Sequence, residues 1–266
     1  MKPVLRGKWR LAAGVAYYRG RRHAQWLFGR TRLAREKSSQ SLPYVHFSHQ
    51  TILLRELQHV EMWMQHNKVK NLRIATACLH GVIIRPGETF SYWKLIGKPT
   101  KRKGYVEGML LSHGRVTAGI GGGLCQLSNL LYWMALHTPL TVTERHRHSY
   151  DVFPDANRTQ PFGSGATCFY NYLDLQIENR TSQTFQLCVW LTDTHLVGEW
   201  RADMPPTRKY EMIEKEHAIT PSIWGGYERS NQLWRNVYAQ DGEWLEQQWL
   251  TENRAYLMYE PLLPKG

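Results

Sequence analysis

The sequence predicts an α+β fold, in which helices are followed by a glycine loop, a central helix and a mixed or antiparallel sheet. Apolar residues recur at helical spacing in the first third of the chain and again directly after the glycine loop. The second half carries runs rich in β-branched and aromatic residues that end at turn residues. Because the helical patterns precede the strands and do not alternate with them, a doubly wound parallel sheet is disfavoured.

The composition is that of an ordinary folded protein, with 266 residues of which 42% are hydrophobic and 21% charged. It excludes a disordered chain, a collagen-like fibre and a small disulfide-bonded scaffold. No apolar run approaches the roughly 20 residues that cross a bilayer. The four cysteines are Cys78, Cys125, Cys168 and Cys188. They form no CxxC pair, so we expect free thiols and neither a zinc ribbon nor a thioredoxin-like pair.

The net charge of +12 is concentrated at the N-terminus. Residues 1–37 contain 11 basic side chains and one acidic side chain, Glu36, whereas residues 38–266 contain 23 basic and 21 acidic ones. The body of the protein is therefore nearly neutral, which disfavours nucleic-acid binding.

This basic arm has an apolar and a basic side when it is drawn as a helix. Its apolar side comprises Val4, Leu11, Val15, Tyr18, Trp26 and Leu33. Four glycines within residues 1–37 are expected to weaken a continuous helix. Two interpretations stay open: an arm that lies on an anionic membrane surface, and a poorly ordered or core-packed extension.

The arm does not have the pattern of a secretion signal. Its longest apolar stretch, residues 11–18, is at the lower limit for a signal-peptide core, and Arg21 and Arg22 follow it where a cleavage site would need small residues. The sequence thus predicts a cytoplasmic protein, peripheral on the inner face of the membrane if the arm binds lipid.

Two helices are predicted after the arm. Residues 37–43 have the composition of a linker, and residues 52–64 repeat apolar side chains at helical spacing. A second helix is expected over residues 67–79 and ends at Gly81. The side chains of this helix that face inward are predicted to be Leu72, Ala75 and Leu79.

A short strand and a glycine loop lead to the central helix. The strand is predicted over residues 82–84 and a turn over residues 85–88. Residues 119–123 form a flexible loop that opens onto a helix over residues 124–137, which Pro139 terminates.

The rest of the chain is predicted to be rich in strands. Residues 140–153, 168–176 and 184–191 have strand composition, and residues 234–240 and 243–249 form a candidate hairpin. We therefore divide the chain into three parts. They are an arm and linker (1–45), an α+β domain (46–195) and a β-rich extension packed on the same domain (196–266).

The most informative segment is the glycine run that precedes Cys125. Consecutive glycines accept positive φ and bring backbone amides close to a bound group. The start of the following helix favours a thiolate at Cys125, and amides nearby would hold an oxyanion. The predicted oxyanion and substrate residues are Gly121, Gly122, Gly123 and Gln126. The alternative is a glycine hinge followed by a buried, inert cysteine.

A base for this cysteine is available downstream. Alternation along a strand would place Glu144, His146 and His148 on one face, as an orienting carboxylate and two candidate bases. Which histidine acts stays open, and His113 is a further candidate that is more simply part of a turn. An exposed strand and a metal pair are the alternatives, but no third metal ligand has usable spacing, so we assign no metal. The loop matches neither a P-loop nor a dinucleotide site, so we assign no cofactor.

Several motifs together resemble the VanW family, over roughly residues 71–191. They are PGETFS at 86–91, GY at 104–105, GGGLCQLS at 121–128, ERHRHS at 144–149, AT at 166–167 and DL at 174–175. The resemblance implies a role in cell walls and glycopeptide resistance. It also implies a cysteine-dependent acyl-transfer enzyme similar to L,D-transpeptidases, or an amide hydrolase, with a peptidoglycan precursor or stem peptide as partner.

The resemblance also implies roles for individual residues. Cys125 would be the nucleophile and His146 or His148 the base, with the amides of Gly122 and Gly123 as the oxyanion site. The family's acid near residues 163–167 is missing here, which leaves the orienting part to Glu144. The alternative function is a non-catalytic accessory protein that binds a cell-wall precursor or a partner enzyme at the membrane surface.

Overall fold

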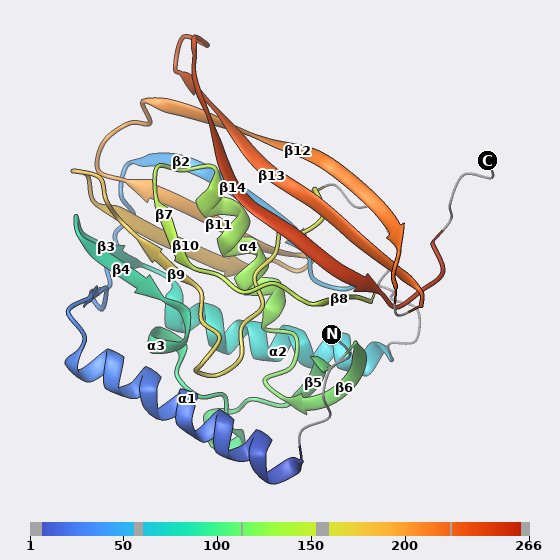
Figure 1. Cartoon of the computed structure of the whole chain (residues 1–266). Helices are drawn as coiled ribbons and strands as arrows, with labels where there is room; N and C mark the ends of the chain where they lie inside the picture. The colour runs from blue at the N-terminus through green and yellow to red at the C-terminus, as the bar shows by residue number, and fades with distance from the viewer. Residues whose placement is uncertain (1–6, 56–60, 113, 153–159, 224, 262–266) are drawn as a thin grey trace.

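The computed structural model describes residues 7–55, 61–112, 114–152, 160–223 and 225–261. It confirms the α+β fold class, with helices and mixed sheets that pack around one core (Figure 1). Its helices are α1 (Lys8–Phe28), α2 (Met62–Leu79), α3 (Tyr92–Ile96) and α4 (Cys125–Leu136), with a 3₁₀ turn η1 at Lys101–Lys103. Among the described residues, no helix combines the length and the apolar character that a membrane crossing needs.

Helices α2 and α4 pack against the first sheet. It is antiparallel, in the order β2-β11-β10-β3. Its strands are β2 (Tyr44–Ile52), β11 (His195–Ala202), β10 (Phe185–Leu191) and β3 (Val82–Ile84). Helix α2 contacts β10, and α4 contacts β11 and β2. At Gly198 of β11 the missing side chain makes room for Met134 of α4.

The second sheet joins the N-terminal arm to the body and has the order β1-β4-β9-β7. Its strands are β1 (Arg32–Leu33), β4 (Glu88–Ser91), β9 (Gln176–Glu178) and β7 (Thr141–Glu144). Strand β1 is parallel to β4, and the other pairs are antiparallel. The C-terminal ends of β4 and β7 carry Ser91 and Glu144, which belong to the candidate site.

The remaining strands form a long sheet and a hairpin. The sheet has the order β12-β13-β14-β8, and β5 pairs with β6. The strands are β12 (Arg208–Pro221), β13 (Tyr227–Ala239), β14 (Trp244–Leu257), β8 (Tyr150–Asp151), β5 (Glu107–Ser112) and β6 (Arg115–Ile120). The predicted hairpin around Gly242 is confirmed, with positive φ at this glycine. His113, the further candidate base, lies outside the described residues, between β5 and β6.

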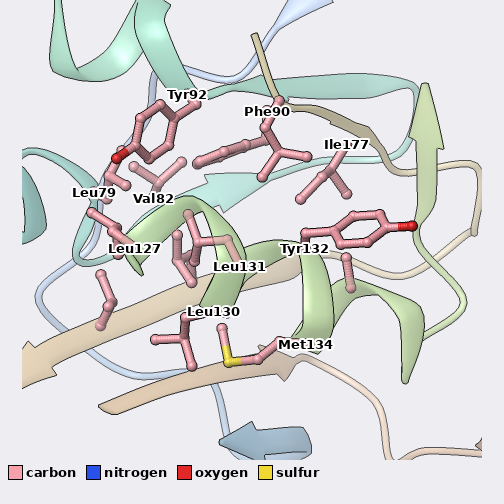
Figure 2. Close-up of a cluster of buried hydrophobic side chains, with 14 of the residues drawn as sticks. Leu79, Val82, Phe90, Tyr92, Leu127, Leu130, Leu131, Tyr132, Met134 and Ile177 are labelled. Atoms are coloured by element: carbon pink, nitrogen blue, oxygen red, sulfur yellow. The ribbon is translucent and has the colours of Figure 1, made fainter. Parts of the chain in front are cut away.

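The core is centred on α4, whose sequence contains no charged residue (Figure 2). Its buried side chains include Leu127, Leu130, Leu131 and Met134, which lie beside side chains of α2, β3, β4 and β9 (Figure 2). The glycine turn before the helix and Pro139 after it set its two ends, as predicted. Burial of this many apolar side chains fixes the first turn of α4, and Cys125 with it.

The structure corrects the first predicted helix. Residues 44–52 form β2, and the helix begins at Met62; residues 56–60 lie outside the described residues. Pairing with β11 decides the conformation of the segment up to Ile52, because a strand beside it offers hydrogen bonds that local spacing does not reveal. The second predicted helix, its buried residues and strand β3 are confirmed.

Two predicted strands are shorter than expected. Strand β7 stops at Glu144 and β8 starts at Tyr150, so residues 145–149 are irregular and do not alternate along a strand. Residues 168–176 contain one bridge, between Phe169 and Leu173, before β9 begins. The carbonyl of His146 accepts a hydrogen bond from the N–H of Thr167, just before the second segment.

Residues 8–28 of the basic arm form one helix that is attached to the body. Helix α1 runs through Gly14 and Gly20, two of the glycines that were expected to weaken it. Gln186 of β10 binds backbone groups of residues 38–42, so the predicted linker is held against the main sheet. At the other predicted boundary, β11 begins at His195, and the same sheet continues across it.

Candidate functional site

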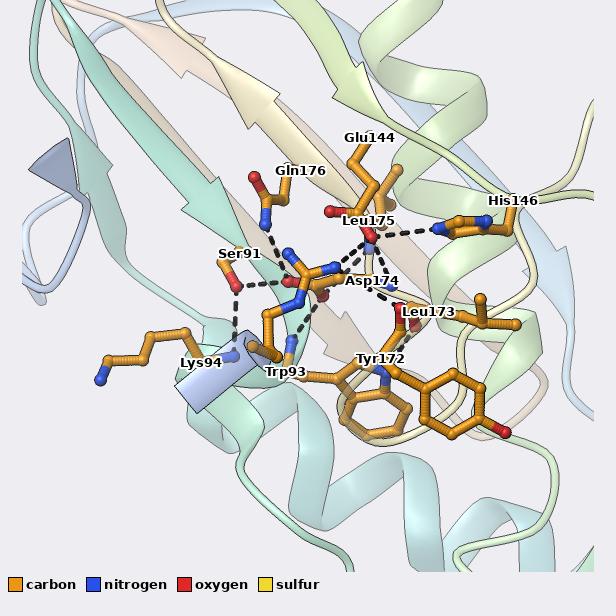
Figure 3. Close-up of polar contacts among 11 residues, drawn as sticks. Ser91, Trp93, Lys94, Glu144, His146, Tyr172, Leu173, Asp174, Leu175 and Gln176 are labelled. Carbon is orange, nitrogen blue, oxygen red and sulfur yellow. Dashed lines mark hydrogen bonds and ion pairs between the residues drawn. The ribbon is translucent and has the colours of Figure 1, made fainter. Parts of the chain in front are cut away.

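A polar network lies where β7 ends, and Glu144 is its centre (Figure 3). Its Oε1 accepts hydrogen bonds from the Arg22 guanidinium at 2.5 Å, from Nε2 of His146 at 3.0 Å and from the backbone N–H of Asp174 at 3.0 Å. The structure thus brings together two of the predicted site residues, Glu144 and His146. Arg22 comes from α1, and no sequence pattern linked the arm to this site.

The network holds Glu144 ionised and His146 in one tautomer. Burial raises the pKa of Glu144, but the hydrogen bonds from His146 and Arg22 and the charge of Arg22 outweigh it and lower the pKa below its ordinary value. Because a carboxylate only accepts hydrogen bonds, Nε2 carries a hydrogen in this contact, and Nδ1 is the nitrogen that Glu144 does not engage. The His146 side chain is 37% exposed. The His146 imidazole is therefore fixed in orientation by Glu144 and still accessible to a substrate that donates a proton.

A second carboxyl, Asp174, lies beside Glu144 and organises the start of α3 (Figure 3). It accepts hydrogen bonds from the Ser91 hydroxyl at 2.5 Å, from the N–H of Trp93 at 2.9 Å and from its neighbour Leu175. Ser91 in turn caps α3 by accepting from the N–H of Lys94. In the sequence, this arrangement is marked by Ser91, the last residue of the PGETFS motif, which directly precedes α3.

Asp174 makes the stability of the protein depend on pH. Burial raises its pKa from 3.8 to about 6, against hydrogen bonds from Ser91 and Trp93. The unfolded carboxyl ionises near its ordinary pKa, so the group favours folding below that pH and loses this contribution as pH rises to about 6. Relative to Asp174→Asn, we expect the wild type to lose about 2 kcal/mol of unfolding free energy between pH 4 and pH 7. Urea unfolding of both proteins at several pH values measures this difference, and a constant difference contradicts it.

The predicted nucleophile lies at the first residue of α4, behind a tight glycine turn. Gly121 and Gly123 have positive φ, which only glycine adopts without strain. The N–H groups of Gly121, Gly122 and Gly123 donate to carbonyls of Val106, Gly119 and Met109, at 3.0, 3.0 and 2.8 Å. An oxyanion at these amides would have to displace one of these bonds.

The fourth residue of the predicted oxyanion and substrate site is also engaged. The amide nitrogen of Gln126 donates to the Thr51 hydroxyl and to the carbonyl of Ile52, both at 2.9 Å. These bonds fasten the start of α4 to β2.

Cys125 is a protonated thiol in this environment. Burial raises its pKa, and the backbone N–H groups of Cys168 and of Cys125 itself oppose the rise without cancelling it. This differs from the expectation that the helix start would favour a thiolate, because desolvation outweighs the local dipole here. The other three thiols are also free, as predicted, and Cys168 and Cys188 are buried.

A chain of hydrogen bonds connects the Cys125 turn with the His146 segment. The Ser128 hydroxyl of α4 donates to the carbonyl of Ala166 at 2.7 Å, and the next residue, Thr167, donates its N–H to the carbonyl of His146 at 2.8 Å. Within the described ranges, no hydrogen bond joins the Cys125 thiol to either imidazole. His148 is neutral, because burial and the charge of Arg145 lower its pKa.

Sequence reasoning missed Lys68, which lies against the glycine turn. A Cβ at Gly123 would collide with its side chain, so the two are in close contact. The Lys68 ammonium is buried and donates to Oε1 of Gln65 at 2.6 Å. Burial, with the charge of Arg55, lowers its pKa to about 8. Nothing in the local pattern marks this lysine, because its burial depends on packing against the turn.

No metal site is evident in the part of the chain that the structure describes: no three His, Cys, Asp or Glu side chains are arranged there so that they could hold a metal ion.

Comparisons with known proteins place this chain in a family. The family described as "VanW like protein" matches residues 67–201. The chain is 33% identical over 245 residues, 92% of its length and 87% of the relative, to the vancomycin B-type resistance protein VanW of Enterococcus faecalis. It is 27% identical over 128 residues to the uncharacterized protein YoaR of Bacillus subtilis, covering 47% of this chain and 41% of that protein. No solved structure matches it. This chain therefore belongs to the VanW family.

Proposed function

We propose that this protein is a cell-wall enzyme that acts on peptidoglycan stem peptides or their precursors by cysteine-dependent acyl transfer or amide hydrolysis. The observation that carries the proposal is the 3.0 Å contact between Glu144 and Nε2 of His146, which orients a partly exposed imidazole with its other nitrogen free to accept a proton. A relative that covers most of the chain is a vancomycin B-type resistance protein, which supports a substrate of the cell wall.

In the proposed reaction, Cys125 forms a thioester with the substrate. The thiol proton passes to Nδ1 of His146 as the sulfur attacks the amide carbonyl, and Glu144 stabilises the imidazolium. The C–N bond then breaks, and the amine leaves with the proton. A second amine or water resolves the thioester, which regenerates the thiol. Because Cys125 is protonated at rest, this step needs the base to approach the sulfur; His148, whose pKa is lowered by burial, is the alternative base.

Trapping the acyl-enzyme tests the proposal. We expect a carbapenem to add its mass to the peptide that contains Cys125, and Cys125→Ser to abolish the adduct. His146→Gln should slow acylation by about 10²-fold or more, because general-base help is lost. Mass spectrometry of the digested protein locates the adduct.

Cys78→Ser is the matched control, because Cys78 is a free thiol of intermediate exposure, as Cys125 is. It should leave the adduct unchanged. Acylation at the same rate in the His146→Gln variant, or at Cys78, would contradict the proposed roles.

A second candidate function is a non-catalytic accessory protein that binds a cell-wall precursor. The observations that favour it are the raised pKa of Cys125 and the internal hydrogen bonds of the glycine-turn amides. This function predicts that Cys125→Ala binds a stem peptide as tightly as the wild type does, with no adduct in either protein. Calorimetric titration with a soluble stem peptide separates the two candidates.

A further inference from the structure

Helix α1 has an inner face that is fixed to the body of the protein. The residues of this face are Val15, Arg19, Arg22 and Trp26, spaced for one side of a helix. Nε of Arg19 donates to the carbonyl of Tyr170 at 3.0 Å, and Arg22 binds Glu144. The Lys94 ammonium lies 5.2 Å from the centre of the Trp26 ring. Of the predicted apolar side, Val15 and Trp26 face the protein, whereas Leu11 and Tyr18 are about half exposed.

The opposite face of α1 is apolar as well, although it is exposed. Trp9, Tyr17, Leu27 and Phe28 are 88%, 66%, 72% and 85% exposed. Small residues fill the surface between them: Ala13, Ala16, Gly20 and Ala24. At 3.6 residues per turn these eight residues cover a continuous sector of roughly 120°. We call this sector the outer stripe. Arg10 and Arg21 lie along one edge of it.

The charge around the outer stripe indicates what covers it. Helix α1 contains basic residues and no acidic one, and Arg30, Arg32 and Arg35 follow it, all exposed. Glu36, the first acidic residue of the chain, is paired with Arg85. A second copy of the helix would bring Arg10 and Arg21 against their equivalents, so like charges oppose self-association. Exposed Trp, Tyr, Leu and Phe beside arginines match the boundary of an anionic bilayer.

We propose that α1 lies flat on an anionic membrane surface, with the outer stripe in the headgroup boundary and the flanking arginines on lipid phosphates. The inner face stays bound to the body, since Arg19, Arg22 and Trp26 do not take part in the stripe. Figure 1 shows α1 along one outer side of the molecule and strands β12, β13 and β14 on the opposite side. The Arg22–Glu144 contact then holds the candidate site about one helix diameter from the lipid.

Sedimentation of the full-length protein with lipid vesicles tests this inference. We expect binding to vesicles of phosphatidylcholine with one quarter phosphatidylglycerol, and about tenfold weaker binding to phosphatidylcholine alone. Trp9→Ser with Phe28→Ser should lower partitioning about tenfold or more. Arg10→Gln with Arg21→Gln should lower it comparably on anionic vesicles and reduce its dependence on salt.

Matched controls separate the outer stripe from exposed apolar surface in general. Trp244→Ser with Trp249→Ser removes two exposed tryptophans from β14, on the opposite side of the molecule, and should leave vesicle binding unchanged. Circular dichroism should show all variants folded. Equal loss in the β14 variant, or binding that ignores lipid charge, would overturn the proposal. So would sedimentation equilibrium that shows a dimer which the outer-stripe variant converts to monomers.

Discussion

Replacing Gly122 by alanine is expected to destabilise the protein by about 3 kcal/mol or more. A Cβ at this position would overlap the carbonyl group of Gly108 and lie 2.6 Å from the backbone nitrogen of Met109. Backbone of β5 cannot move aside as a flexible side chain can. The side-chain nitrogen of Asn71 also donates a 2.9 Å hydrogen bond to the carbonyl of Gly122. The side-chain oxygen of Asn71 accepts a hydrogen bond from the N–H of Val106. Urea unfolding followed by circular dichroism measures the loss.

Gly20→Ala is the control for this substitution. Gly20 lies in the exposed part of α1, where an added Cβ meets nothing within 4 Å. Alanine should therefore raise the stability of the helix by about 0.5–1 kcal/mol, through its higher propensity. If the unfolding free energy of Gly122→Ala lies within 1 kcal/mol of the wild-type value, the glycine turn does not pack closely on β5.

Replacing Glu144 by alanine is expected to cost about 3 kcal/mol of stability and to release α1 from the body. The Arg22 side chain is 11% exposed and that of Glu144 19%, so the substitution leaves a nearly buried guanidinium without its carboxylate. It also removes the acceptor of the Asp174 N–H and of His146. Faster hydrogen exchange within α1, together with the unfolding free energy, reports both effects. Acylation of Cys125 should fall with them, because His146 loses its orienting group.

An exposed ion pair provides the comparison. Glu36→Ala breaks the pair with Arg85 on the surface and should change stability by no more than about 1 kcal/mol. A cycle with Arg22→Met isolates the buried interaction, and we expect a coupling energy of about 1–3 kcal/mol between Arg22 and Glu144. If Glu144→Ala is as mild as Glu36→Ala and α1 exchanges at the wild-type rate, the network does not hold the helix.

The fold could be predicted where local chemistry decides it. The glycine run and Pro139 marked both ends of α4, and Gly242 marked the hairpin between β13 and β14. Helical spacing identified the buried residues of α2. The same reasoning assigned a helix to residues near Ile52, because it had no information about β11, which supplies the hydrogen bonds of that strand.

The candidate site could be predicted only in part. Glu144 and His146 are two residues apart, so their contact depends on local geometry, and the motif suggested it. The state of Cys125 depends instead on how deeply its thiol is buried, and burial reverses the effect of the helix start on the pKa. His148 was on the same predicted face as His146, but the irregular segment after Glu144 removes that alternation.

The sequence by itself determined the family, the α+β class, the glycine turn that leads into α4 and the basic character of the arm. Composition, short-range spacing and motif order carry that information. Only the tertiary structure decided that Arg22 of α1 binds Glu144, that Asp174 binds Ser91, and which face of α1 remains exposed. These contacts join residues 122 and 83 positions apart. Their energies depend on desolvation and on packing between distant segments, which no local pattern encodes.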